Sequence, residues 1–548
     1  MAATRSRSNF DRCDLLAITL ILAGYLLALL VMPIQRDFAI LDDWTYVHSA
    51  EEVARGHGFK PSEYAQATIV THTYWGALFA TLFGINFTSF NLATMVMSLL
   101  AAFTFYVLLR RLGFEPALSG LGVALLTLNP YFINLSYSFM TEITFLAMLL
   151  LSCLLYYEGL ARRSNSWLLV GSIAASLTFL TRQFGLAVVL AVLIWLLYAR
   201  KLTLINLVAV VLLPILAVIG YFAWSRGFPL TFSGSVGREE MRELLRPERW
   251  VRRAAHFIYL ALPLPGLLVP FWGKVRHWKV TAILSAGAAV AVFALWQIKL
   301  RLVEQGESTL DELSTYWLQP LWPNPVLLFC IGAALTVWLV AGLVERSWPN
   351  VVALVRRRRE PVPSDFLYLV GAILFAGTYG VSSGFLDRYW LPVLPFLIMG
   401  GLTWARGRSL TRLTPAFMVL VVLAIFGILV RLDQYDYTHT QWQAGRWVVD
   451  QSVPLNKIEN GYTWDGYFMH DEPVKRWGAG SLDIARIGRV YPPQEVIDPE
   501  YVIDTSSKEG YYVVRTFNYL SRLSGMSTQE IYVLKRDENV RQPITPNK

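Results

Sequence analysis

Two adjacent carboxylates, Asp42 and Asp43, lie in the segment LDDWTY (residues 41–46), which follows the first long apolar segment of the chain. A carboxylate within reach of a hydroxyl can take its proton while the hydroxyl attacks, and a second carboxylate can orient the first or share a cation with it. Aspartate is also a favoured helix cap and suits the positive end of a helix. A cap needs one aspartate, whereas acids near membrane depth are costly and usually functional. On the residues alone, both interpretations stay open.

A third acid, Glu142, follows Thr141 in the segment SFMTE and opens an apolar segment. A helix start is one interpretation, because Thr141 suits a cap and glutamate suits the first turn. The other is functional, since Glu142 is predicted on the same side of the membrane as Asp42. Two converging acids could hold a divalent ion through oxygen ligands. No His or Cys cluster with zinc spacing predicts a tightly held metal.

Cationic or polar residues are predicted at the same side: His72 in THTYW, Arg182 in TRQ and Arg388 in LDRYWLP. Arginine presents a rigid fork that suits phosphate oxygens, and a group at this depth would meet a lipid phosphate. The simpler alternative for each residue is snorkelling to headgroups, or an ion pair such as Asp387 with Arg388.

The sequence lacks the motifs that are typical of several other classes of protein. The chain has no Walker-type phosphate loop, no GxGxxG fingerprint and no nucleophile elbow. Few acids or bases lie within the apolar segments, which argues against a proton-coupled transporter. The net charge of +9 does not indicate nucleic acid, because the basic residues lie between apolar segments, where the positive-inside rule expects them. The pattern favours chemistry at a membrane interface.

The elements that would position these residues are transmembrane helices. Of the residues, 55% are hydrophobic and 16% charged, well below the quarter that is usual for charge in soluble proteins. Hydropathy predicts a polytopic α-helical membrane protein with about 13 transmembrane helices. The predicted spans are 15–31, 90–109, 117–128, 143–157, 167–180, 184–198, 204–224, 254–271, 280–295, 325–343, 366–380, 389–404 and 415–430.

Basic residues between the spans predict the orientation. Alternate loops are rich in Arg and Lys, so these loops and the N-terminus are expected in the cytoplasm. An odd number of spans then places the C-terminus outside. The chain is predicted to be an integral protein of the cell membrane. The segment 226–253 mixes Arg with Glu and predicts an interfacial helix. The predicted inside loops contain Arg110–Arg111, Arg162–Arg163, Arg200–Lys201, 274–279, 356–359 and 406–412.

Two outside regions are too long to be turns. The first, 35–89, predicts two surface helices at Trp44–Arg55 and Tyr74–Phe83. The second, 432–548, has the composition of a small soluble α/β domain outside the cytoplasm, which leaves 1–431 as the transmembrane domain. Its predicted elements are a helix at 441–451 and strands at 501–504, 511–514 and 531–534.

The order of these features resembles the GT-C superfamily of membrane glycosyltransferases, in particular the branch with the lipid A aminoarabinose transferase and the protein O-mannosyltransferases. The resemblance covers most of the chain. It rests on the acidic pair with Tyr46 downstream, a polar residue before a short aromatic helix, an acid that opens the fourth span, and a late Arg-Tyr-x-x-Pro run. The residues concerned are Asp42, Asp43, Tyr46, His72, Tyr74, Trp75, Glu142, Arg388, Tyr389, Pro392 and Pro395.

The resemblance implies transfer of one sugar from a polyprenyl-phosphate donor to a hydroxyl of a protein, lipid or glycan outside the cytoplasm. It implies Asp42 as the general base of an inverting displacement. Relatives with aminoarabinose activity carry Lys-Pro-Pro where this sequence has His72-Thr-Tyr, which argues against that substrate. The implied roles are catalysis for Asp42, Asp43 and Glu142, donor-phosphate binding for His72, Arg182, Arg388 and Tyr389, and substrate binding for Tyr46.

Two alternatives share these features. A transporter or flippase for lipid-linked sugars could use the same cations without turnover. A scaffold subunit could have lost catalysis and use the C-terminal domain to bind a partner. The two retained acids, in a sequence with few acids near its spans, argue against the scaffold. The sugar, the acceptor and a divalent metal requirement are not specified by the residues.

Overall fold

The structure is a computed structural model that describes most of the chain. The described residues are 12–62, 65, 67–227, 278–304, 359–380, 387–406, 414–470 and 499–537, together with 330, 334, 337, 338, 341, 345, 352 and 353.

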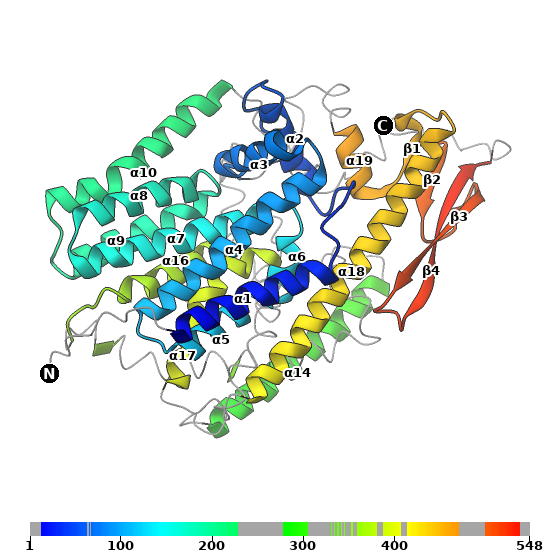
Figure 1. The fold of residues 1–548 in the computed structure, drawn as a ribbon. Helices are drawn as coiled ribbons and strands as arrows, with labels where there is room; N and C mark the ends of the chain where they lie inside the picture. The colour runs from blue at the N-terminus through cyan, green and yellow to red at the C-terminus, as the bar shows by residue number, and fades with distance from the viewer. Residues whose placement is uncertain are drawn as a thin grey trace.

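The body of the protein is a bundle of apolar helices (Figure 1). In the described part of the chain, four helices are long and apolar enough to cross a membrane: α4 (Phe87–Arg111), α7 (Thr141–Arg162), α10 (Leu204–Trp224) and the segment Phe417–Asp450 of α18. Helices α5 (Pro116–Thr127) and α6 (Pro130–Ser136) together form a broken span or re-entrant pair, bent by 67°. The protein is therefore a polytopic helical membrane protein.

Other predicted spans correspond to further helices in the described part of the chain. The predicted span 254–271 lies outside the described residues, as does most of 325–343, so the number of about 13 stays a prediction. The remaining helices of the body, within the described residues, are α1 (Arg12–Val31), α8 (Asn165–Phe179), α9 (Leu186–Tyr198), α14 (Trp278–Glu304), α16 (Asp365–Gly380) and α17 (Leu394–Ala405).

Ion pairs fasten several helices at the end of the bundle that is rich in arginine. Arg110, near the end of α4, pairs with the buried Asp14 near the start of α1, with 3.0 Å between Nη2 and Oδ2. Arg111 lies 2.8 Å from Glu158 of α7, and Arg162 at the end of α7 pairs with the same carboxylate. Because α7 begins at Thr141, this end is opposite to the one that carries Glu142.

The first predicted outside region forms two short helices near the predicted positions, but most residues of the first helix are buried, so it does not lie on the surface. They are α2 (Asp43–Ala54) and α3 (Val70–Phe83), which pack against each other. Helix α3 also packs on α4. The predicted interfacial helix at 226–253 lies almost wholly outside the described residues.

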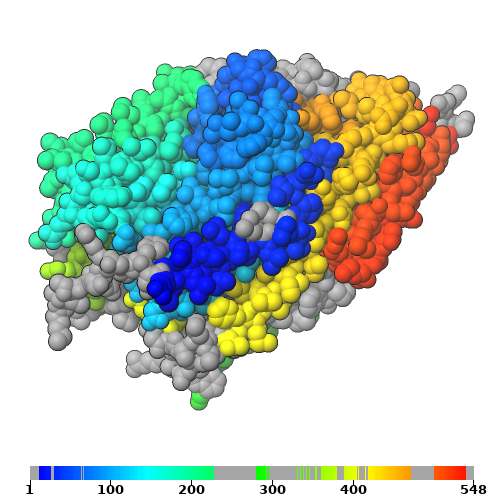
Figure 2. Space-filling view, viewed as in Figure 1, coloured from blue at the N-terminus to red at the C-terminus, as the bar shows by residue number. Residues whose placement is uncertain are grey.

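The predicted domain boundary at 431/432 falls inside a single helix, α18 (Thr414–Asp450). The predicted helix at 441–451 is the end of this element. Figure 2 shows α18 in yellow along one face of the molecule, between the helical body and the red strands. The apolar span and the amphipathic segment after it form one continuous helix, because no Pro or Gly interrupts residues 428–444. A separate C-terminal domain stays a prediction.

The C-terminal region contains a four-stranded sheet in the order β1-β2-β4-β3. The pair β1–β2 is parallel and the other pairs are antiparallel. The three predicted strands are present, and two of them extend beyond the predicted ends. Ala444 and Val448 of α18 pack in one apolar cluster with Ile531 and Val533. The elements are β1 (Ile458–Glu459), α19 (Gly461–Met469), β2 (Tyr501–Asp504), β3 (Tyr511–Ser521) and β4 (Ser527–Arg536).

Helix α19 docks closely on α2. The reason for the close approach is Gly466, because a Cβ atom at this position would overlap the indole ring of the fully buried Trp44. The phenol of Tyr467 adds a hydrogen bond to Glu51 at 3.2 Å. The C-terminal region thereby reaches back to the first outside region of the chain.

This contact generates a first prediction. Gly466→Ala should destabilise the protein by about 1–3 kcal/mol, the usual cost of overpacking a well-packed site. The measurement is thermal unfolding of the full chain in detergent. Gly220→Ala is the control, because a Cβ at Gly220 meets nothing within 4 Å. Equal melting temperatures for the two variants would contradict the docking.

Candidate active site

The two adjacent aspartates point in different directions. Leu41 has a left-handed φ of 56°, a conformation that bulky residues rarely adopt, and helix α2 begins two residues later. Asp43 is fully buried and lies 2.6 Å from Arg36. Its carboxylate also accepts hydrogen bonds from the backbone N–H of Ile40 at 2.8 Å and of Phe139 at 3.3 Å. Asp43 therefore ties the first outside region to the start of α7.

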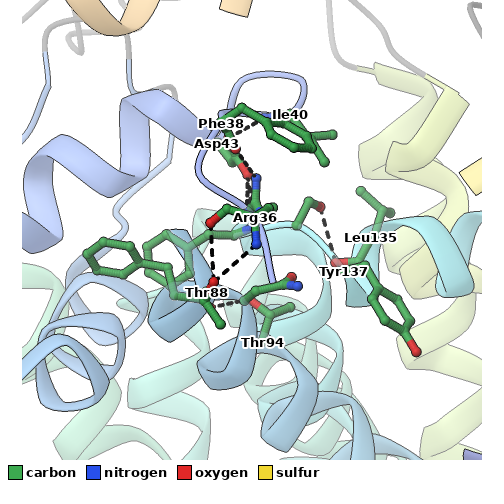
Figure 3. A network of polar contacts seen from close by, with 12 residues as sticks. Arg36, Phe38, Ile40, Asp43, Thr88, Thr94, Leu135 and Tyr137 are labelled. Atoms are coloured by element: carbon green, nitrogen blue, oxygen red, sulfur yellow. Dashed lines mark hydrogen bonds and ion pairs between the residues drawn. The ribbon is translucent and has the colours of Figure 1, made fainter. Parts of the chain in front are cut away.

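Arg36 is the partner that makes this burial possible. It donates to the carbonyl of Phe38 at 3.0 Å, and its backbone N–H donates to the hydroxyl of Thr88 at 3.1 Å. Figure 3 shows Arg36 between Asp43 and Thr88, which belongs to α4. A buried carboxylate is stable only when it is paired and hydrogen-bonded. The geometry gives Asp43 a positioning role, and the predicted catalytic role stays a prediction.

Asp42 faces a different environment. Its Oδ2 pairs with Nη2 of Arg388, and its Oδ1 accepts a hydrogen bond from the phenol of Tyr462 at 2.5 Å. The Asp42 side chain is 32% exposed, whereas that of Arg388 is almost buried. Of the two aspartates, Asp42 is therefore the one that an external molecule can reach.

Glu142 lies on the other side of Arg388. Its Oε1 is 3.2 Å from Nε of Arg388 and 3.1 Å from Nη2 of Arg182, and its side chain is fully buried. Burial alone would lower the pKa of Arg388, but the charges of Asp42 and Glu142 raise it well above its usual value. Both arginines stay charged. The four groups alternate in sign from Asp42 through Arg388 and Glu142 to Arg182.

Separate elements bring these four side chains together. Glu142 is in the first turn of α7, and Arg388 lies in the 3-10 helix η6 (Asp387–Val393) that precedes α17. Arg182 follows α8, and the end of α8 is held by the segment that precedes α3. There the hydroxyl of Thr68 donates to the carbonyl of Phe179 at 2.5 Å.

Two backbone hydrogen bonds also connect the start of α3 to the segment after α8. The N–H of Ile69 donates to the carbonyl of Thr181 and that of Thr71 to the carbonyl of Leu180, both at 3.2 Å. Ile69 has a left-handed φ of 49°. Such strain persists only where the surrounding structure holds it, and here it aligns α3 with the segment that carries Arg182.

Two tyrosines complete the candidate site. The guanidinium of Arg182 lies 5.1 Å from the ring centre of Tyr389, within the range of a cation–π contact. Tyr46 of α2 is buried, and burial together with the charges of Glu142 and Asp42 raises its pKa. Its phenol therefore stays protonated beside the acids and can donate a hydrogen bond.

His72 is placed differently from the prediction. Its Nδ1 lies 2.9 Å from the hydroxyl of Thr144 and its Nε2 lies 3.3 Å from the carbonyl of Phe139. The ring stacks on Phe139 at 4.0 Å and meets the edge of Tyr46. Burial lowers the pKa of His72 to about 3, so the ring is neutral. This geometry favours a packing role, and phosphate binding by His72 stays a prediction.

A divalent metal does not fit these residues well. The position between Asp42 and Glu142 is taken by the guanidinium of Arg388. Within the described residues, no group of three or more His, Cys, Asp or Glu side chains gathers in a way that could hold a metal. The predicted divalent ion therefore has no assigned position.

Three residues of this region were not predicted. Arg36 precedes the acidic pair by a few residues, so the sequence does contain a signal for an ion pair with it. Arg431 is buried in α18, where it donates to the carbonyl of Tyr137 at 3.0 Å and lies over the Tyr137 ring. Tyr462 comes from α19, and no local pattern indicates its contact with Asp42, which is 420 residues away.

The arrangement can hold a proton acceptor and an anion side by side. Asp42 offers a half-exposed carboxylate, and Arg388 and Arg182 offer two buried forks. Oε1 of Glu142 accepts a hydrogen bond from Arg182 and forms an ion pair with Arg388, while Oε2 has no hydrogen-bond partner among the described residues. An anion that drew Arg388 toward itself would leave Oδ2 of Asp42 available for a proton.

Comparison with known proteins gives a partial match. Residues 70–224 match the sequence model of a family described as dolichyl-phosphate-mannose-protein mannosyltransferase. No curated protein matches the chain. The matched residues run from α3 to α10 and include His72, Glu142 and Arg182. The family match confirms the predicted resemblance to membrane glycosyltransferases of the GT-C superfamily.

Two solved structures align with this chain over most of its length. ArnT from Cupriavidus metallidurans bound to undecaprenyl phosphate is 14% identical, with a TM-score of 0.48, and the alignment covers 96% of this chain and 99% of that chain. The oligosaccharyltransferase AglB from Archaeoglobus fulgidus, in complex with an inhibitory peptide and a dolichol-phosphate, is 12% identical, with a TM-score of 0.42. That alignment covers 90% of this chain and 69% of that chain.

The burial of His72 generates a prediction about pH. An unfolded histidine takes up a proton near pH 6.5, whereas folded His72 resists protonation down to about pH 3. The unfolded state therefore binds more protons in this window, and the free energy of unfolding falls as the pH falls. Between pH 7.5 and pH 5, this loss amounts to about 2 kcal/mol, and His72→Gln should remove it.

The measurement is the melting temperature of the full chain in detergent between pH 7.5 and pH 5. His57→Gln serves as the control, because His57 is exposed. The same pH slope for wild type and for His72→Gln would show that His72 is not held neutral.

Proposed function

We propose that the protein is a glycosyltransferase that moves a single sugar from a polyprenyl-phosphate donor to an acceptor hydroxyl on the extracytoplasmic side of the membrane. The observation that carries the proposal is the half-exposed carboxylate of Asp42 beside the buried guanidinium of Arg388. The family that matches residues 70–224 is named for a lipid-phosphate sugar donor and a protein acceptor, which supports this reaction class.

Asp42 acts as the general base in this proposal. The acceptor hydroxyl attacks the anomeric carbon of the sugar while its proton passes to Asp42. The bond from the anomeric carbon to the phosphate oxygen breaks, and its electron pair stays on that oxygen. One displacement of this kind inverts the configuration. The leaving group is a stable phosphate anion, so it needs no strong acid.

Arg388 and Arg182 bind and stabilise that phosphate. Both present planar forks that match phosphate oxygens, and the charge that grows on the leaving group is greatest in the transition state, where such donors act most strongly. Arg388 also pairs with Asp42. Donor binding would draw Arg388 toward the phosphate and release Oδ2 of Asp42, so the base becomes available only when a donor is present.

The remaining site residues support these two. Glu142 holds both guanidinium groups in place through Oε1. Tyr389 lies under the fork of Arg182, and the protonated phenol of Tyr46 can bind the substrate. The apolar prenyl chain of the donor would lie against the lipid-facing helices of the bundle.

The distribution of basic residues supports the extracytoplasmic side. Arg110, Arg111 and Arg162 lie at the end of α4 and α7 that is opposite to Glu142. Under the positive-inside rule this end faces the cytoplasm. The N-terminus would then lie inside, and the site and the C-terminal sheet outside.

A flippase or transporter for lipid-linked sugars is the second candidate, because the same arginines could bind the donor without turnover. Asp42 favours the enzyme, since a carboxylate exposed beside a phosphate site repels the anion unless it takes a proton. Covalent attachment of labelled sugar to an acceptor distinguishes the two activities.

Asp42→Asn tests the base. An amide cannot take the proton, so sugar transfer should fall by roughly 10²–10⁴-fold, the usual contribution of general base catalysis. Membranes that contain the full chain are supplied with radiolabelled dolichyl-phosphate mannose, and the label in protein, lipid and glycan fractions is counted. Asp37→Asn is the matched control, because Asp37 lies in the same region, is exposed and pairs with Arg446. Undiminished transfer by correctly inserted Asp42→Asn protein would exclude Asp42 as the base.

Arg388→Lys tests the phosphate site. Lysine keeps the charge but loses the fork that can bind the phosphate and a carboxylate together. The affinity for dolichyl phosphate should fall by about tenfold or more, which corresponds to one or two lost charged hydrogen bonds. The measurement is thermal stabilisation of the purified protein by dolichyl phosphate.

The control is Arg359→Lys. Arg359 makes a forked pair with Asp365 at 2.8 and 2.9 Å, just before α16, so its variant loses a comparable pair elsewhere. If both variants lose affinity equally, Arg388 has no special role in phosphate binding.

A further inference from the structure

We infer that Tyr462 of α19 is a positioning residue for Asp42, so that the C-terminal region completes the active site on the membrane-embedded body. This inference rests on the proposed function, because it assigns Tyr462 a role through the general base. It adds a donor that the amino-acid pattern around the acidic pair does not contain.

The contact is direct and complements that of Arg388. The phenol of Tyr462 donates to Oδ1 of Asp42 at 2.5 Å, while Arg388 pairs with Oδ2. Two donors on the two oxygens fix the plane of the carboxylate. An ionised carboxylate has about four lone-pair sites, so a proton can still reach Asp42 while Tyr462 stays bound.

Tyr462 remains a donor at ordinary pH. Its desolvated hydroxyl and the adjacent charge of Asp42 hold its pKa well above the usual value, so the phenol keeps its proton. As a whole residue, Tyr462 is 37% exposed. Removal of the hydroxyl therefore takes nothing out of the apolar core, and a phenylalanine at this position should leave the fold intact.

The position of Tyr462 is set by contacts on both sides of it. Its ring meets the indole of Trp44 edge to face at 6.3 Å. One turn further along α19, Gly466 lies against the same indole. At the next residue, the carbonyl of Tyr467 lies 3.0 Å from Nε2 of His48. Helices α2 and α19 thus hold Tyr462 and Asp42 as one unit.

The charged and titratable groups around Asp42 come from four elements. Arg388 and Tyr389 come from η6, Glu142 comes from α7 behind Arg388, and Tyr46 comes from α2, while Tyr462 itself comes from α19. When Arg388 moves to a donor phosphate, Tyr462 is the contact that keeps the carboxylate of Asp42 oriented toward the acceptor.

Tyr462→Phe tests this role in the full-length protein. With dolichyl-phosphate mannose as the donor probe, kcat should fall by about tenfold, while KM for the donor should change by less than about twofold, because Tyr462 does not contact the phosphate in this scheme.

Tyr467→Phe is the matched control. It removes a phenol from the same helix that also donates to a carboxylate, that of Glu51, but it does not contact Asp42. This variant should keep the wild-type kcat and KM for the donor. If the two variants behave alike, Tyr462 acts only in docking α19. If Tyr462→Phe is faster than wild type, the phenol restrains the base, and the positioning role is wrong.

The two variants Asp42→Asn and Tyr462→Phe distinguish failure of this inference from failure of the proposed function. If Asp42→Asn is inactive and Tyr462→Phe matches wild type, the inference fails while the general base stands. If Asp42→Asn is fully active, the base assignment fails, and the inference fails with it whatever Tyr462→Phe does. Thermal unfolding of Tyr462→Phe within about 2 °C of wild type shows that a lower kcat does not come from misfolding.

Discussion

The buried guanidinium of Arg388 is the interaction on which the rest of the site depends. A buried charge is stable only when it is paired and hydrogen-bonded, and loss of one partner of such a pair is strongly destabilising. Arg388 meets this requirement with Asp42 on one side and Glu142 on the other. The requirement holds together three parts of the chain that are far apart in sequence: the turn before α2, the first turn of α7 and the 3-10 helix before α17.

The acidic pair shows how one sequence motif can serve two structural purposes. Asp43 turns inward to Arg36 and the N–H groups of Ile40 and Phe139, and this fixes the backbone of the turn. Asp42, one residue earlier, therefore points away from Asp43 and toward Arg388. The left-handed Leu41 allows the change of direction. The buried carboxylate is therefore a support for the exposed one, and the pair cannot be shifted by a residue without losing both contacts.

The gathering of these residue types at one end of the bundle was predictable from the sequence, but their pairing was not. Hydropathy and loop charge placed Asp42, Glu142, Arg182 and Arg388 at one interface, and the structure brings these four together. Which carboxylate meets which guanidinium depends on helix packing, which a single sequence does not show. His72 illustrates the same limit, because only the structure reveals that its ring is buried against Phe139. The continuity of α18 was missed because a change of composition was interpreted as a change of domain.

Helix α18 also constrains how such proteins can be recombined. Its 37 residues extend over about 55 Å, and they run from the apolar span to the sheet and to the turn before α19. An α-helix of this kind transmits rotation along its axis, at about 100° for each residue added or removed. A chimera joined at residue 431 would therefore turn the sheet and α19 around the body unless the helical phase were kept. The turn at Gln451–Pro454, where α18 has ended, is the point at which the C-terminal region can be exchanged without changing that phase.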